Sequence, residues 1–219
     1  MTPITFWFDP ISPYAYLAFE RLPQSLEGCS YVVEYRPILL AGLLKHWGQL
    51  GPAEIAPKRD WTYRQVQWLA RQQGSAFALP TAHPFNPLPL LRLLVACGFG
   101  GRPNRWQCET VLRHVWCSGA AADDPQRLVE LTARLAPPRD PQESAVKDAL
   151  RNDTDEAIAR GVFGVPTFEL PARAAGTAPL LLWGLDALPM LRAALDGDPW
   201  FDTPSWQAPP LAGAGLTRR

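Results

Sequence analysis

Two short strand-rich regions lie at opposite ends of this chain, and neither is long enough to build a sheet by itself. Residues 4–8 and 31–36 alternate as strands do, and strand character returns only at residues 166–170 and 179–183. No convincing strand pattern occurs between residues 41 and 160. Because short strands must bury their apolar faces against other elements, we expect both ends of the chain to share one sheet.

The first region is typical of a β-α-β unit. After the strand at residues 4–8, Ser12 offers an N-cap hydroxyl and Pro13 stands at the first helical position. Apolar residues follow at helical spacing, and the strand at residues 31–36 comes next. A right-handed crossover would make the two strands parallel. The last region reads as β-β-α and ends in an amphipathic helix over residues 185–195.

The long segment between these regions is expected to be helical. Apolar residues recur at intervals of three and four, and clusters of Pro and Gly separate the helices. We predict an α/β domain formed by residues 1–40 and 161–201, a helical insertion at 41–160 that covers the site, and a loosely ordered tail at 202–219. The expected helices of the insertion span residues 58–73, 88–99, 105–117, 126–135 and 141–160.

Charge and cysteine spacing exclude several classes of function. Lys plus Arg and Asp plus Glu both number 21, so there is no basic excess to bind nucleic acid or an anionic membrane. Neither a signal peptide nor a membrane span is visible, and we expect a cytoplasmic protein. The cysteines form no C-x-x-C pair and no metal-like spacing with histidines, which predicts buried, reduced thiols and no metal site. They are Cys29, Cys97, Cys108 and Cys117.

Residues 8–18, which read FDPISPYAYLA, carry the most specific signal. They resemble the F-D-x-x-S-P-x-x-Y-L-A opening of the 2-hydroxychromene-2-carboxylate isomerase family, a branch of the DsbA-like thioredoxin superfamily related to kappa-class glutathione transferases. The resemblance implies a thioredoxin-like fold, β-α-β then β-β-α, interrupted by the large helical insertion. Redox members carry C-x-x-C in this turn, whereas the matching positions here are Ser12 and Ala15. Dithiol exchange through the turn is therefore excluded.

Ser12 is the candidate catalytic residue. A thiolate at a helix N-terminus is stabilised by unpaired N–H groups and the helix dipole, and a hydroxyl donor adds a charge-assisted hydrogen bond. Both effects lower the thiol pKa from its free value of about 8.5. The resemblance implies the thiol, since family members bind glutathione and hold its sulfur with this serine. The alternative role for Ser12 is that of a plain N-cap.

Two motifs near the C-terminus complete the expected glutathione site. Residues 161–168, GVFGVPTF, match the family's G-V-F-G-V-P-T-F, whose proline follows a cis bond that exposes backbone for pairing with glutathione; a trans proline starting a strand is the alternative. Residues 182–186, LWGLD, resemble the family's W-G-x-D turn, whose aspartate contacts the γ-glutamyl group. The alternative role for Asp186 is capping of the final helix, and the alternative for Trp183 is membership of the core. The expected cofactor-binding residues are Val165, Pro166, Trp183, Gly184, Leu185 and Asp186.

Weaker resemblances in the insertion suggest a substrate pocket. Lys45 matches a family lysine near the substrate carboxylate, and Asn86 matches the asparagine of a P-x-N-x-x-x-x-x-R stretch that faces the pocket. Both are candidate substrate-binding residues. The family's D-x-x-R-W-A segment appears here as QVQWLA at residues 65–70, without its acidic and basic positions. This chain thus departs from the family pattern more in the substrate pocket than in the glutathione site.

The resemblance implies a glutathione-dependent isomerase that interconverts 2-hydroxychromene-2-carboxylate and trans-o-hydroxybenzylidenepyruvate through a glutathione thiolate held by Ser12. Its partners would be a small aromatic substrate and a second copy of the chain, because homodimers are usual in the family. A kappa-type glutathione transferase or peroxidase would use the same motifs. A non-catalytic glutathione-binding relative is the third alternative.

Overall fold

The computed structural model describes residues 1–173 and 176–207, and both ends of the chain contribute to one four-stranded sheet. The strands are β1 (Thr2–Phe8), β2 (Tyr31–Pro37), β3 (Thr167–Leu170) and β4 (Leu180–Trp183), in the order β2-β1-β3-β4. β1 and β2 are parallel, and β3 is antiparallel to both β1 and β4. The predictions of a shared sheet and of a parallel first pair are confirmed.

Helices account for most of the remaining described residues. Those between β2 and β3 lie in the segment expected to be an all-helical insertion, except that α2 begins one residue before it at Leu40, and the limits of the insertion as a separate domain stay a prediction. None of the described helices is long and apolar enough to cross a membrane. The helices are α1 (Pro13–Ser25), α2 (Leu40–Trp47), α3 (Ala56–Gln73), α4 (Leu88–Cys97), α5 (Arg105–Trp116), α6 (Pro125–Leu135), α7 (Ser144–Ala159), α8 (Leu188–Leu195) and α9 (Pro204–Gln207), with 3-10 turns η1 (Pro52–Glu54), η2 (Leu185–Ala187) and η3 (Pro199–Asp202).

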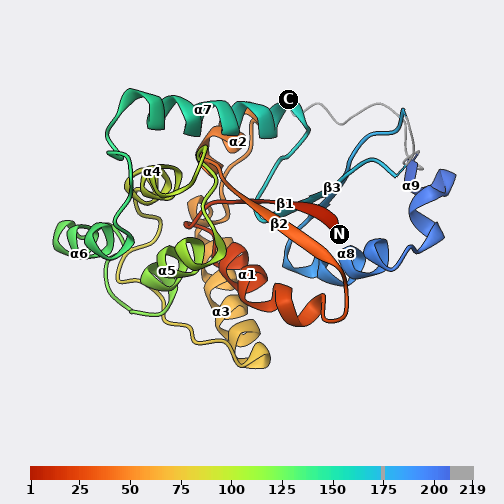
Figure 1. Cartoon of the computed structure of the whole chain (residues 1–219). Helices are drawn as coiled ribbons and strands as arrows, with labels where there is room; N and C mark the ends of the chain where they lie inside the picture. Colours follow the sequence, from red (N-terminus) through yellow and green to blue (C-terminus); the bar gives the residue numbers. More distant parts are fainter. Residues whose placement is uncertain (174–175, 208–219) are drawn as a thin grey trace.

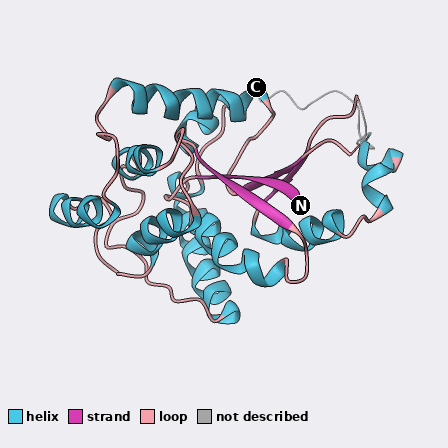
Figure 2. Cartoon of the chain, viewed as in Figure 1, coloured by secondary structure: helices cyan, strands magenta, loops and turns pink. Residues whose placement is uncertain are grey.

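The sheet is covered by helices on both faces (Figures 1 and 2). Phe6 and Phe8 lie in the main core cluster, with residues of α1 and α8, whereas Trp7 lies in a second cluster that includes Leu43 of α2. All three β1 side chains are fully buried. Helices of the insertion, α2 and α7, therefore enclose the face of the sheet that α1 and α8 leave open.

An ion-pair network fixes α7 against this second face. The Arg36 guanidinium lies 4.3 Å from the centre of the Trp7 ring and pairs with Asp153 and Glu156 of α7. The hydrogen bond from Arg36 lowers the pKa of Glu156 to about 2. The Trp7 indole donates to Glu169 at 2.9 Å. Because residues 161–166 follow α7 directly, the network also helps to place the turn before β3.

Three features of the structure differ from the sequence expectations. The helix α2 was not predicted, and it ends at Gly48 in the left-handed conformation, φ +64°. The final helix is split, since residues 185–187 form a 3-10 turn before α8. Residues 204–207 of the expected loose tail form α9, where Trp206 packs against Phe201, and residues 208–219 lie outside the described residues.

All four cysteine thiols are free. Cys97 and Cys108 are buried as expected, and burial raises the pKa of the Cys97 thiol to about 11. Cys29 and Cys117 are only half-buried, so the expectation of burial is wrong for these two. The Cys117 sulfur lies 3.2 Å from the Tyr16 hydroxyl.

Candidate active site

Ser12 lies at the start of α1, where its hydroxyl joins the helix to the turn before β3. As the N-cap residue, Ser12 accepts a hydrogen bond from the Ala15 N–H at 3.2 Å. The same hydroxyl donates to the carbonyl of Val165 at 3.4 Å, a long and therefore weak hydrogen bond. Two segments far apart in sequence thus meet at one hydroxyl, which can exchange the weak bond for a better acceptor.

The Val165–Pro166 peptide bond is cis, as predicted, so the trans alternative is wrong. Within the described residues, the Val165 N–H donates to no acceptor, and the N–H of Tyr14 in the first turn of α1 has no acceptor either. Ser12 therefore stands beside a backbone N–H and C=O that can pair with an extended peptide-like ligand. The unpaired helical N–H offers positive partial charge to an anion.

The turn after β4 is bonded directly to the cis-proline turn. Gly184 N–H donates to the carbonyl of Pro166 at 2.9 Å, and Gly184 has φ +103°, a conformation that favours glycine. The Trp183 indole lies so close to Gly164 that a Cβ there would stand 2.6 Å from its Nε1. All three sequence motifs therefore come together, as the resemblance implied.

The structure excludes the two alternative roles considered for this turn, core membership for Trp183 and helix capping for Asp186. Trp183 is 53% exposed and packs on Phe163, with ring centres 5.0 Å apart, so it does not belong to the core. Asp186 is exposed and lies in the 3-10 turn, while α8 begins after Ala187 without a side-chain cap. Its carboxylate has no hydrogen-bond donor among the described residues. Asp186 is thus available to a cation.

Asp9 is fully buried and is hydrogen-bonded to the turn that carries Ser12. Its carboxylate accepts hydrogen bonds from Ile11 N–H at 3.0 Å and from Leu40 N–H at 2.9 Å, and its carbonyl accepts one from Ser12 N–H at 3.0 Å. Burial raises its pKa from 3.8 to about 7 against the opposing effect of the two N–H donors. Asp9 thereby ties the Ser12 turn to the beginning of α2.

Comparison with known proteins identifies the family. The profile of the DSBA-like thioredoxin domain matches residues 3–196. The chain belongs to this family. Two similar proteins are a 2-hydroxychromene-2-carboxylate isomerase of Pseudomonas sp. (strain C18), 28% identical with 90% of this chain and 91% of that protein covered, and glutathione S-transferase kappa 2 of Caenorhabditis elegans, 29% identical with 86% and 89% covered.

A solved structure of a 2-hydroxychromene-2-carboxylate isomerase superposes on this DSBA-like chain with a TM-score of 0.72 at 25% identity, covering 89% of this chain and 94% of the other. The cytosolic disulfide reductase DsbM of Pseudomonas aeruginosa, solved with GSH, has a TM-score of 0.55 at 15% identity, with 89% and 99% covered. At that identity the likeness to DsbM shows the fold alone.

Sequence analysis missed the side chains that support the turn of this DSBA-like chain from the insertion. The Trp116 indole donates to the Pro10 carbonyl at 2.9 Å, and His83 Nε2 lies 2.8 Å from the Ile11 carbonyl. The Tyr14 hydroxyl donates to Gln65 of α3 at 2.6 Å. Within residues 83–92 the sequence indicates only Asn86 as a candidate, and no sequence signal points to Trp116.

The two predicted substrate-binding residues take no part in these hydrogen bonds. Lys45 is exposed on α2 and forms no ion pair with the described residues. Asn86 is exposed, and its side-chain oxygen accepts a hydrogen bond from Leu88 N–H at 3.1 Å at the start of α4. Neither side chain bonds to Ser12 or Asp186, and their roles stay predictions.

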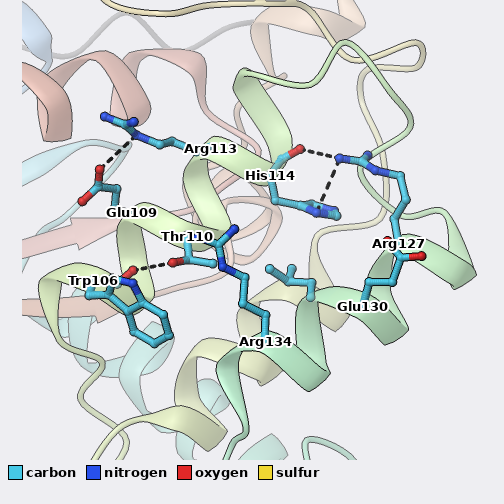
Figure 3. A pocket seen from close by; sticks show the side chains of 9 residues that line it. Trp106, Glu109, Thr110, Arg113, His114, Arg127, Glu130 and Arg134 are labelled. Carbon is cyan, nitrogen blue, oxygen red and sulfur yellow. Dashed lines mark hydrogen bonds and ion pairs between the residues drawn. The ribbon is translucent and has the colours of Figure 1, made fainter.

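A separate cleft of about 510 Å³ lies between α5 and α6 and includes no residue of the three motifs (Figure 3). Arg113 pairs with Glu109 at 3.0 Å, which compensates the charge of this arginine, and Arg127 donates to the His114 carbonyl at 2.8 Å. This cleft is therefore distinct from the Ser12 turn. The lining residues are Trp106, Glu109, Thr110, Arg113, His114, Arg127, Glu130, Leu131 and Arg134.

Proposed function

We propose that the chain is a glutathione-dependent isomerase that interconverts 2-hydroxychromene-2-carboxylate and trans-o-hydroxybenzylidenepyruvate. The observation that carries this proposal is the 3.4 Å separation of the Ser12 hydroxyl from the Val165 carbonyl at the cis-proline turn. A single thiol-bearing tripeptide can reach both groups. Relatives named for this isomerase activity support the reaction type.

The donors and acceptors of the site fit glutathione group by group. The free N–H and the carbonyl of Val165 would pair with the peptide backbone, and the exposed carboxylate of Asp186 would take the γ-glutamyl ammonium. The Ser12 hydroxyl and the free N–H of Tyr14 would face the sulfur. Glutathione, when bound, supplies a nucleophilic thiolate that can add reversibly to an electrophilic carbon.

Ser12 has the task of keeping the thiol ionised. Its hydroxyl would exchange the weak bond to Val165 for a charge-assisted bond to sulfur, while α1 adds the positive end of its dipole. Ala15 leaves no protein thiol to resolve a disulfide, so the site suits addition and elimination without net oxidation.

The proposed substrate is small and aromatic. The rings of Phe163 and Trp183 are 41% and 53% exposed and flank the turn that carries Val165, and they offer a surface on which a planar ring can stack. We also propose that the protein is a homodimer, as the family resemblance implies. We place it in the cytoplasm because free thiols and the use of reduced glutathione suit a reducing compartment.

A kappa-type transferase or peroxidase is the second candidate, supported by the relative from Caenorhabditis elegans named for that class. The same Ser12 site would ionise the thiol, but the thiol would be consumed. The amount of free glutathione after turnover therefore separates the two reactions.

Calorimetric titration with glutathione, followed by turnover assays with the chromene, chlorodinitrobenzene and peroxide, tests the proposal. S-methylglutathione is the matched control, because it retains the peptide contacts and lacks an ionisable thiol. We expect saturable binding of both peptides, and isomerisation of the chromene only with glutathione, whose total stays constant. Absence of binding, or chromene turnover that proceeds equally with S-methylglutathione, would refute the proposal.

A further inference from the structure

The two peptide groups that precede Ser12 are hydrogen-bonded at both of their polar ends. In the first, the Pro10 carbonyl accepts from Trp116 at 2.9 Å and the Ile11 N–H donates to Asp9 at 3.0 Å. In the second, the Ile11 carbonyl contacts His83 at 2.8 Å and the Ser12 N–H donates to the Asp9 carbonyl at 3.0 Å. Both peptide planes are therefore fixed. The Ser12 carbonyl on the other side accepts from Tyr16 N–H at 3.2 Å in α1, so the direction of the bond from the Ser12 Cα to its side chain is fixed as well.

His83 reaches the second of these peptide groups from the insertion. A carbonyl oxygen can only accept, so His83 Nε2 must carry a proton to bond the Ile11 carbonyl. Burial lowers the pKa of His83, which favours the neutral ring and leaves Nδ1 as an acceptor. The Tyr63 hydroxyl donates to the His83 carbonyl at 2.9 Å and also lies 2.8 Å from Nδ1. The Ile11 carbonyl thus selects the tautomer, and Tyr63 contacts both the ring and the backbone of His83.

Aromatic rings hold the His83 imidazole in place on several sides. Its centre lies 5.5 Å from the ring of Tyr63 in α3, 5.4 Å from that of Trp116 in α5 and 5.9 Å from that of Phe85 in its own loop. A ring packed in this way cannot turn freely to present its other nitrogen. The imidazole is thus fixed in both orientation and tautomer.

We propose that His83 is a positioning residue for the thiolate site: through the Ile11 carbonyl it fixes the peptide plane from which the Ser12 hydroxyl projects. This inference rests on the proposed function. His83 does not touch the sulfur and acts through the direction of the Ser12 hydroxyl and the first turn of α1. Its contribution should therefore appear in ionisation of the thiol and in kcat, more than in the affinity for glutathione.

The test compares His83→Ala with His83→Gln, whose side-chain amide keeps a donor near the position of Nε2. We expect His83→Ala to change glutathione affinity by less than about threefold, to raise the pKa of the bound thiol measured by thiolate absorbance, and to lower kcat roughly fivefold or more. His83→Gln should restore most of the thiol ionisation and most of kcat. The Tyr63→Phe values of thiol pKa and kcat should fall between those of His83→Ala and His83→Gln. His114→Ala is the matched control, because His114 is also half-buried and bonds a carbonyl, that of Ala122 at 2.9 Å, in the insertion.

A second measurement works without glutathione. In a Ser12→Cys background, alkylation rates resolved by peptide mapping give the pKa of the introduced thiol, and adding His83→Ala should raise that pKa whereas adding His114→Ala should not. Failure of the wild type to bind glutathione would sink the proposed function alone. An unchanged thiol pKa in the folded Ser12→Cys, His83→Ala protein would overturn the positioning role whatever the cofactor. Failure of folded His83→Gln to restore activity would count equally against it.

Discussion

Replacing Asp9 with asparagine is expected to change how folding stability depends on pH. The Asp9 carboxyl is fully buried, and burial raises its pKa to about 7 in the folded protein. Its unfolded value is about 3.9. As pH rises, the unfolded chain loses this proton first, so the folded state becomes progressively less stable relative to it. The loss begins near the unfolded pKa and is complete above the folded pKa.

The magnitude follows from the separation of the two pKa values. About three pKa units at 1.36 kcal/mol each give a loss of about 4 kcal/mol between about pH 4 and about pH 8. Because Asp9 is 0% exposed, solvent screening does not reduce this figure. Asp9→Asn removes the titration but leaves its amide N–H₂ facing one of the two backbone donors, the N–H of Ile11 or that of Leu40, at a cost that does not vary with pH.

Urea unfolding of the wild type and of Asp9→Asn at several pH values measures the effect. The stability of the variant relative to the wild type should rise by about 4 kcal/mol from about pH 4 to about pH 8, whatever its starting value. A difference that stays constant with pH would show that Asp9 does not titrate in this range, and the account of its burial would be wrong.

Three further predictions concern the cysteines, Gly184 and the oligomeric state. Replacing all four cysteines with alanine or serine should leave turnover intact in a folded protein, because none of them lies in the Ser12 turn; loss of activity with glutathione binding retained would reveal an overlooked thiol. Gly184→Ala should weaken glutathione binding roughly tenfold, since a Cβ there would collide with the Asp186 carboxylate. The control is Gly197→Ala, which also has a positive φ, +85°, but open space around the Cβ, so that it should strain only the backbone. Calorimetric titration with glutathione compares the two variants. Sedimentation should give twice the chain mass, and a monomer at all concentrations would exclude the homodimer.

Local patterns were sufficient to predict the elements that carry the site. The alternation around Phe6 gave β1, and the Ser12-Pro13 pair gave the start of α1, because both signals depend on neighbouring residues. Helix α2 gave no such signal, since it contains Gly42 and begins without a side-chain cap. Burial of Leu43 beside Trp7 holds it in place, and that packing is a tertiary effect.

The supports of the turn could not be predicted for a similar reason. His83 and Ile11 are 72 residues apart, and Trp116 and Pro10 are 106 apart, so only the folded insertion brings them together. The motifs indicated the residues that we propose to face glutathione, by resemblance alone. They carried no information on which side chains of the insertion bond to the backbone of the Ser12 turn.

Ser12→Ala tests the central claim, that this hydroxyl ionises bound glutathione. Most binding contacts would come from the Val165 backbone and Asp186, so affinity should fall only modestly. Loss of one charge-assisted hydrogen bond of about 1.5–3 kcal/mol should raise the pKa of the bound thiol and slow turnover roughly tenfold or more. Asp124→Ala, which removes the N-cap of α6, controls for the loss of a helix cap alone.

The decisive measurement is the pKa of glutathione bound to Ser12→Ala, followed by thiolate absorbance across pH beside the wild type and the Asp124→Ala control. We expect a raised thiol pKa in Ser12→Ala alone, together with slower turnover. An unchanged thiol pKa with full turnover would mean that Ser12 only caps α1 and that the catalytic centre lies elsewhere.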